Sequence, residues 1–228
     1  MNHTTSTTPN TTVTHIHLLL DRSGSMEAIR PDVIGGVNAF LAGQRAAGDD
    51  ALVTLVQFDT VEPHHVVAEA APISAIADLT TATFVPRGGT PLLDASGAII
   101  HMAEERAALR RRHGLPAEQV LVATVTDGQE NSSRRYTQAA LAEIVRARRA
   151  DGWLFAYLSA DLDAYGDAQR LGYDTGSIST FAPTAGGSAA AFGSLGRAVA
   201  SKREAVRAAA PVSVDDFFEG TKEAETTR

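Results

Sequence analysis

An apolar segment followed directly by short polar side chains sets the strongest constraint on how this chain folds. The segment from Ile16 to Leu20 is apolar apart from His17, and residues 21–25 then read Asp-Arg-Ser-Gly-Ser. A continuous rather than alternating apolar strand is typical of a parallel sheet that helices cover on both faces. Ligand crevices in such sheets lie outside the carboxyl ends of the strands. The sequence therefore predicts a polar site at the end of a buried central strand.

Two more oxygen-bearing side chains stand at the ends of distant elements. Asp127 ends an apolar strand pattern, and Thr90 precedes Pro91 at the expected start of a helix, with Thr90 as the N-cap and Pro91 in the first helical position. Gly128, Glu130 and Asn131 closely follow Asp127 in the sequence, and either Asn131 or Glu130 is a candidate for ordering the side chains behind the site. Loops at the carboxyl ends of neighbouring parallel strands meet at one edge of the sheet, so we expect these side chains to converge.

These three parts, in this order, resemble the metal-ion-dependent adhesion site of the von Willebrand factor A (VWA) family. In that family an Asp-x-Ser-x-Ser loop is followed by a distant Thr and a distant Asp. The matching residues here are Asp21, Ser23, Ser25, Thr90 and Asp127. The resemblance covers residues 13–209 and implies a Rossmann-like α/β fold in three layers. Its sheet would be doubly wound and mostly parallel, with about six strands and one antiparallel edge strand.

The resemblance also implies a function. The chain is expected to be a divalent-cation-dependent protein-binding module, whose metal ion completes its coordination with a carboxylate from a partner protein. Mg²⁺ prefers oxygen ligands at about 2.1 Å and keeps several waters. The five residues offer two carboxylates and three hydroxyls but no soft ligand, so Mg²⁺, Mn²⁺ or Ca²⁺ is expected rather than Zn²⁺. Two carboxylates leave a bound dication near neutrality, so that an acidic partner can approach it.

Hydrophobic periodicity divides the chain into alternating strands and helices. Strands are expected at residues 13–20, 51–58, 64–70, 119–126, 153–159 and 177–181, with 64–70 antiparallel at an edge. Helices are expected at residues 31–48, 90–113, 137–152, 161–172 and around 192–206, with a helical turn at 73–79. This alternation favours a doubly wound sheet. One domain at 13–209 would lie between a disordered Thr-rich tail at 1–12 and a polar tail at 210–228.

Composition excludes several classes of protein. The net charge is −7, whereas nucleic-acid-binding proteins usually carry a basic stripe. No apolar run approaches the roughly 20 residues that span a bilayer, and the N-terminal segment lacks the features of a secretion signal. The sequence contains no cysteine, which excludes disulfides and thiolate metal sites. We therefore expect a cytoplasmic protein that binds neither nucleic acid nor membrane.

Enzymatic alternatives lack necessary groups. A magnesium-dependent phosphatase of the haloacid-dehalogenase type also begins with Asp at the end of its first strand. Such an enzyme needs a second carboxylate two residues later as a general acid, and this chain has Ser23 there. Neither a Gly-x-Ser-x-Gly elbow nor a phosphate-binding glycine loop follows a strand. The expectation is a protein that is not an enzyme, with a metal-free scaffold domain as a further alternative.

Four histidines in two pairs lie on predicted strands. His15 and His17 share one strand face, where a metal-binding pair is the alternative to ordinary packing and hydrogen bonding. His64 and His65 point to opposite faces, which disfavours joint ligation.

Charged residues elsewhere in the sequence are expected to lie on the surface rather than in a binding site. The basic residues at 110–113 and 146–149 are predicted to form solvated helix faces, with an acidic partner as the alternative. The segment Val214–Glu219 is expected to fray, with docking into another protein as the alternative.

Overall fold

The computed structural model describes residues 13–128, 130–161, 163–218 and 220. Its centre is a six-stranded sheet in the order β3-β2-β1-β4-β5-β6. The strands are β1 (Thr14–Asp21), β2 (Ala51–Phe58), β3 (His65–Pro72), β4 (Gln119–Thr126), β5 (Leu154–Ser159) and β6 (Ile178–Thr180). All neighbouring strands run parallel except β2 and β3, which are antiparallel. The predicted fold class and the antiparallel edge strand are confirmed.

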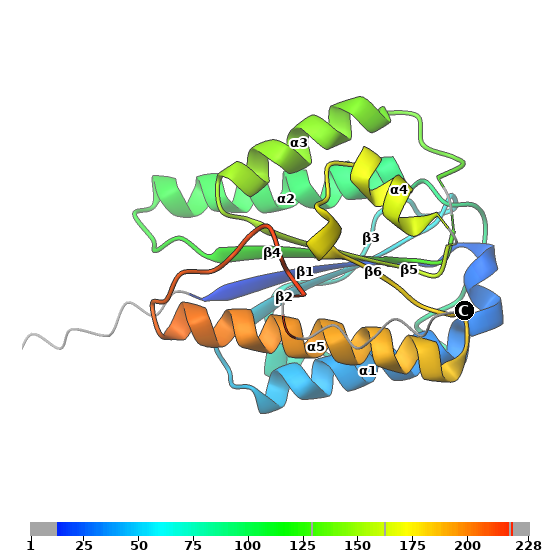
Figure 1. Cartoon of the computed structure of the whole chain (residues 1–228), viewed down its shortest axis with the longest axis horizontal. Coiled ribbons are helices and arrows are strands. Elements are labelled where there is room, and N and C mark those ends of the chain that lie inside the picture. Colours follow the sequence, from blue (N-terminus) through cyan, green and yellow to red (C-terminus); the bar gives the residue numbers. More distant parts are fainter. Residues whose placement is uncertain (1–12, 129, 162, 219, 221–228) are drawn as a thin grey trace, which may run out of the picture.

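Helices cover both faces of the sheet (Figure 1). The helices α1 (Arg30–Ala46) and α5 (Ala185–Arg207) lie on one face, and α2 (Leu92–Arg112), α3 (Gln138–Ala150) and α4 (Ala164–Arg170) lie on the other. Short 3-10 helices are η1 (Gly24–Ile29), η2 (Ile73–Ala75) and η3 (Thr175–Ser177). None of the described helices is both long and apolar enough to cross a lipid bilayer.

Strand β1 contributes to a separate core on each side. Ile16, Leu18 and Leu20 pack in the core that includes residues of α1 and α5, whereas Leu19 packs in the core formed with α2 and α3. Successive side chains of a strand point to opposite faces, so Asp21 lies on the α2 side with Leu19. Apolar residues on both faces of β1 thus hold its polar carboxyl end in a central position.

Two helices begin later than the sequence predicts. Helix α2 starts at Leu92, and Pro91 rather than Thr90 occupies its N-cap position, without a side-chain cap. The predicted capping role of Thr90 is therefore wrong, because the ψ angle of 59° at Pro91 is not helical. The helix expected to open at Asp161 begins at Ala164. The predicted cap at Thr137 is confirmed, since its side chain accepts a hydrogen bond from the Ala140 amide.

The chain packs back onto the domain after α5. Phe217 and Phe218 are 1% and 2% exposed and belong to the core between the sheet and α5. The Phe218 amide donates a 3.0 Å hydrogen bond to the Gly176 carbonyl oxygen. The expected fraying is thus wrong for these two residues, and the docking surface they use is their own domain. The predicted tail at 1–12 and residues 219 and 221–228 of the predicted tail at 210–228 lie outside the described residues.

The pairing of β3 with β2 is irregular. Its register shifts between Val53 and Leu55 and again between Leu55 and Val56. Ala70 has a φ angle of 44°, a left-handed conformation that is uncommon for a residue with a side chain. Register shifts of this kind mark β-bulges, where an extra residue in one strand bends and twists that strand.

The two histidines of β1 are buried against each other. Their ring centroids are 4.0 Å apart. The ring nitrogens of His15 hydrogen-bond to Glu118 and Thr54, so they are occupied by protein partners. Both ring nitrogens of His17 are buried without a hydrogen-bond partner among the described residues. Burial and the neighbouring His15 lower the pKa of His17 well below its ordinary value, and charge effects from Glu118 and Arg106 are smaller.

This lowered pKa predicts a loss of stability on acidification. Below a pH of about 6.5 the unfolded chain takes up a proton at His17 that the folded protein resists, so the free energy of unfolding falls as the pH falls. We expect His17→Leu to reduce the loss between about pH 7 and pH 5 by about 1 kcal/mol or more. Urea unfolding at both pH values measures the difference, in which the titration of groups that do not interact with His17 cancels. His101→Gln, at an exposed position on α2, is the control. Equal pH dependence of His17→Leu and the unaltered protein would contradict the expectation.

Candidate metal centre

The candidate site lies where the order of the sheet reverses. Strand β1 pairs with β2 on one side and with β4 on the other. Crevices for ligands form at such switch points, beyond the carboxyl ends of the strands. Asp21 is the last residue of β1, and Asp127 directly follows β4. The two carboxylates are therefore placed at the crevice by adjacent parallel strands.

The carboxylate of Asp21 is completely buried. One oxygen accepts a 2.7 Å hydrogen bond from the Ser23 amide, and the other accepts a 2.6 Å hydrogen bond from the Thr126 hydroxyl. Burial raises the pKa of Asp21 to about 6, although these hydrogen bonds oppose the rise. A buried carboxylate is costly unless a positive charge is nearby. The environment of Asp21 thus suits a bound cation.

Hydroxyl groups connect Asp21 to Asp127. The Oγ atoms of Ser23 and Ser25 are 3.1 Å apart, and Ser25 Oγ donates a 2.8 Å hydrogen bond to Asp127 Oδ1. Burial raises the pKa of Asp127, and the charge of Asp161 adds to the rise.

The surroundings of Gly128 show that the hydroxyl of Thr90 lies in the same region as that of Ser25. A Cβ atom added at Gly128 would lie 3.5 Å from Ser25 Oγ and 3.8 Å from Thr90 Oγ1. The structure therefore brings together the side chains of Asp21, Ser23, Ser25, Thr90 and Asp127.

Thr90 is positioned by the loop that follows β4. Asn131 Oδ1 accepts a 2.9 Å hydrogen bond from the Thr90 amide, and the Asn131 amide donates a 3.2 Å hydrogen bond to the Thr90 carbonyl oxygen. On the other side, the Gly89 amide donates to Thr60 Oγ1 at 2.9 Å. The backbones of Gly89 and Thr90 thus bind two different loops, and the Thr90 hydroxyl lies beside Gly128 in the site.

The loop after β4 and the start of α2 also cap each other. The Glu130 carboxylate accepts hydrogen bonds from the amides of Leu93, Ser132 and Ser133. In return, the Asp94 carboxylate accepts from the amides of residues 134, 135 and 136. Of the two candidates for ordering the site, Asn131 holds the ligand residue Thr90, whereas Glu130 caps α2.

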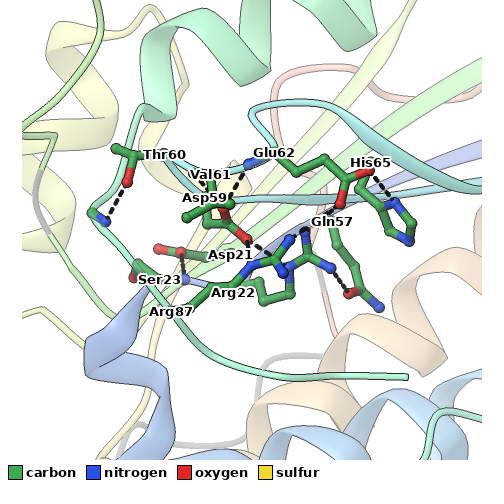
Figure 2. Close-up of polar contacts among 11 residues, drawn as sticks. Asp21, Arg22, Ser23, Gln57, Asp59, Thr60, Val61, Glu62, His65 and Arg87 are labelled. Atoms are coloured by element: carbon green, nitrogen blue, oxygen red, sulfur yellow. Dashed lines mark hydrogen bonds and ion pairs between the residues drawn. The ribbon is translucent and has the colours of Figure 1, made fainter. Parts of the chain in front are cut away.

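Sequence reasoning missed three polar residues around the site. Thr126 donates to Asp21 from the adjacent strand. Asp161 follows β5 by two residues and acts on the pKa of Asp127. Asp59 directly follows β2 and binds two arginines (Figure 2). The signal for Asp59 and Asp161 was present, because both follow strands in the way that singled out Asp127.

The side chains brought together at this edge carry oxygen atoms, the kind of donor that a hard cation prefers. No group of three or more acidic or histidine side chains in the described part of the chain is arranged to hold a metal ion. A cation at this edge would therefore depend on hydroxyl groups beside the two carboxylates. Such a set of oxygen donors suits Mg²⁺, Mn²⁺ or Ca²⁺.

Comparisons with known proteins identify the fold. No protein-family model matches the sequence, and no curated protein matches it. Among solved structures, a von Willebrand factor type A protein from Catenulispora acidiphila is 15% identical, with a TM-score of 0.57 over 84% of this chain and 43% of that chain. The SpRpn10 VWA domain is 12% identical, with a TM-score of 0.51 over 78% of this chain and 92% of that one.

A third similar structure is the pilus adhesin SpaC from Lactobacillus rhamnosus GG. It is 16% identical, with a TM-score of 0.61 over 83% of this chain and 31% of that chain. The present chain thus spans less than half the length of the SpaC and Catenulispora chains. At these identities the likeness concerns the fold. The chain has the fold of a VWA domain.

Proposed function

We propose that this chain is a divalent-cation-dependent protein-binding module with a complete adhesion site of the VWA type. The observation that carries the proposal is the 2.8 Å hydrogen bond between Ser25 and Asp127, which are 102 residues apart in the sequence. It joins the loop after β1 to the loop after β4 beside the buried Asp21. The proposed ligands are Asp21, Ser23, Ser25, Thr90 and Asp127. The proposed cation is Mg²⁺, Mn²⁺ or Ca²⁺.

The proposed ligands are of two kinds, charged carboxylates and neutral hydroxyls. Asp21 and Asp127 supply the negative charge, and the three hydroxyls are neutral donors that water can replace. When bound, the cation would act as a positive anchor for an oxygen of a partner carboxylate. Two carboxylates nearly neutralise a dication, so a third carboxylate, from a partner protein, meets little repulsion.

The surface beside Thr90 has room for a partner. A hollow there is lined by residues from three loops, among them Thr60, Pro91, Asn131 and Arg134. Val61, next to Thr60 in the loop after β2, is 66% exposed. The lining carries one basic and one acidic side chain, Arg134 and Asp94, so we assign the selection of an acidic peptide residue to the cation. The proposed setting is the cytoplasm, in keeping with a sequence that has no cysteine.

Removing a charged ligand should abolish most cation binding. We expect Asp21→Ala and Asp127→Ala each to weaken Mg²⁺ or Mn²⁺ binding by more than about 10-fold, the lower end of what loss of even an outer-shell partner costs. Ser23→Ala should have a smaller effect, because water can replace a neutral ligand. Titration calorimetry measures the affinities, with Asp78→Ala on the exposed Asp78–Arg45 pair as the control. Unchanged affinity in both Asp variants would overturn the proposed site.

We further propose that the protein has no hydrolytic activity of its own. The position of a general acid is taken by Ser23, whose hydroxyl lies 3.1 Å from that of Ser25. A phosphomonoester incubated with the protein and Mg²⁺ should therefore remain intact. Metal-dependent turnover that disappears in Asp21→Asn would favour the phosphatase alternative instead.

Partner binding should depend on both the cation and one acidic side chain. Peptides selected for binding in Mg²⁺ should be released by EDTA and should lose affinity when their Asp or Glu is replaced by Asn or Gln. The fold should survive EDTA, which circular dichroism checks, because the two cores do not include the site. Thr90→Ala should weaken peptide binding more than cation binding. Peptide binding that persists undiminished in EDTA would instead support the metal-free scaffold alternative.

A further inference from the structure

We propose that Arg87 is a positioning residue for the cation site, acting through a charged cluster that holds the Thr90 loop against the Asp21 loop. This cluster, the Asp59 bridge, consists of Arg22, Asp59, Glu62 and Arg87 (Figure 2). None of its members is a proposed cation ligand. The inference rests on the proposed function and adds to it a requirement for residues outside the ligand set.

Both arginines bind the same two carboxylates. The Nε atoms of Arg22 and Arg87 donate to one oxygen of Asp59, at 2.8 Å and 3.0 Å. Their terminal nitrogens donate to one oxygen of Glu62, at 3.2 Å and 3.1 Å. Figure 2 shows the two guanidinium groups converging beneath the loop that carries Asp59 and Glu62. Two positive and two negative charges thus form a nearly neutral group, which also contacts Gln57 through Arg22 and His65 through Glu62.

Asp59 is itself fixed and charged. Its second oxygen accepts hydrogen bonds from the amides of Val61 and Glu62, at 2.6 Å and 2.8 Å. Burial acts to raise the pKa of Asp59, but hydrogen bonds from the Glu62 amide and from Arg87 lower it overall. Asp59 is therefore ionised at neutral pH and offers both arginines a rigid anchor.

The backbones of the arginines join the same three segments. The Arg22 amide donates to the Phe58 carbonyl oxygen at the end of β2, and the Arg87 amide donates to the Arg22 carbonyl oxygen, each at 2.9 Å. The Gly24 amide donates to the Gly88 carbonyl oxygen at 3.0 Å. Arg22 lies between the proposed ligands Asp21 and Ser23, and Arg87 lies three residues before Thr90. The Asp59 bridge therefore sets the distance between two parts of the site.

Electrostatics and positioning predict opposite effects of removing Arg87. If only charge mattered, loss of a positive side chain near the site would strengthen cation binding. If Arg87 positions Thr90, its loss would weaken cation binding, because a ligand loop would no longer be held in place. Replacing a residue that orients a metal ligand weakens metal affinity by about 10- to 100-fold. The sign of the change therefore decides between the two roles.

The domain contains a matched control at the opposite end of its sheet. Asp50, just before β2, accepts hydrogen bonds from Arg203 and Arg207. The side chain of Arg207 is 36% exposed, close to the 40% of Arg87. Arg207→Met thus removes the same charge from the same kind of bridge, far from the cation site. In Arg87→Met the carboxylate of Asp59 keeps Arg22 as its partner, so the fold should be maintained.

The experiment compares the full chain with Arg87→Met and Arg207→Met by calorimetry with Mn²⁺. We expect about 10-fold weaker binding in Arg87→Met and unchanged binding in Arg207→Met. Arg87→Lys, which keeps the charge but loses the fork of donors, should still bind more weakly than the unaltered chain. Unchanged or tighter binding in Arg87→Met would overturn the inference, while absence of binding in the unaltered chain would overturn the proposed function.

A second measurement needs no metal. In EDTA, hydrogen exchange at the amides of Gly24 and Gly89 should be faster in Arg87→Met than in Arg207→Met, because these amides bond to Gly88 and Thr60 across the loops that the Asp59 bridge holds together. Equal exchange rates in the two variants would also overturn the inference, whatever the cation affinities.

Discussion

Burial of the Asp21 carboxylate is the constraint around which the carboxyl edge of the sheet is organised. Strand β1 is central, with β2 and β4 on its two sides and apolar cores on both faces, and its last residue, Asp21, is completely buried. The two hydrogen bonds to Asp21 contribute about 1.5–3 kcal/mol each. Removing an ion from water costs several kcal/mol. Burial still raises the pKa of Asp21 to about 6 despite these hydrogen bonds, so they offset only part of the cost, and a nearby cation would offset more of it.

The loops at this edge are held mainly by one another. Asn131 binds the backbone of Thr90 on both sides, Glu130 caps α2, and Asp59 binds arginines from two other loops. These interactions are polar and join segments far apart in the sequence. Since each loop is positioned by its neighbours, a change in one of them is transmitted to the others. The site behaves as a single unit although its residues come from three separate segments.

The sequence contained enough to predict the sheet and the meeting of the two carboxylates. Asp21 and Asp127 follow apolar strands, and the carboxyl ends of neighbouring parallel strands share an edge by geometry. The capping role of Thr90 was mispredicted, because a Thr-Pro pair also occurs just outside a helix.

Other features depend on contacts that local patterns do not contain. Asp59 was visible as a strand-end carboxylate, but its partners Arg22 and Arg87 are 37 and 28 residues away and depend on the register of three segments. Phe217 and Phe218 lie in a stretch whose composition is polar and charged, so their burial was hidden by their neighbours. In both cases the missing information was tertiary, and no window of sequence would have supplied it.

The irregular pairing of β3 has a consequence for the behaviour of this protein at high concentration. An exposed edge strand offers unpaired amides and carbonyls to the edges of other molecules, which is a common route to aggregation. The register shifts along β2 and β3 bend this edge, and the opposite edge strand, β6, is only three residues long. Neither edge presents a long, flat row of hydrogen-bonding groups. The shape of both edges therefore disfavours edge-to-edge self-association of the sheet.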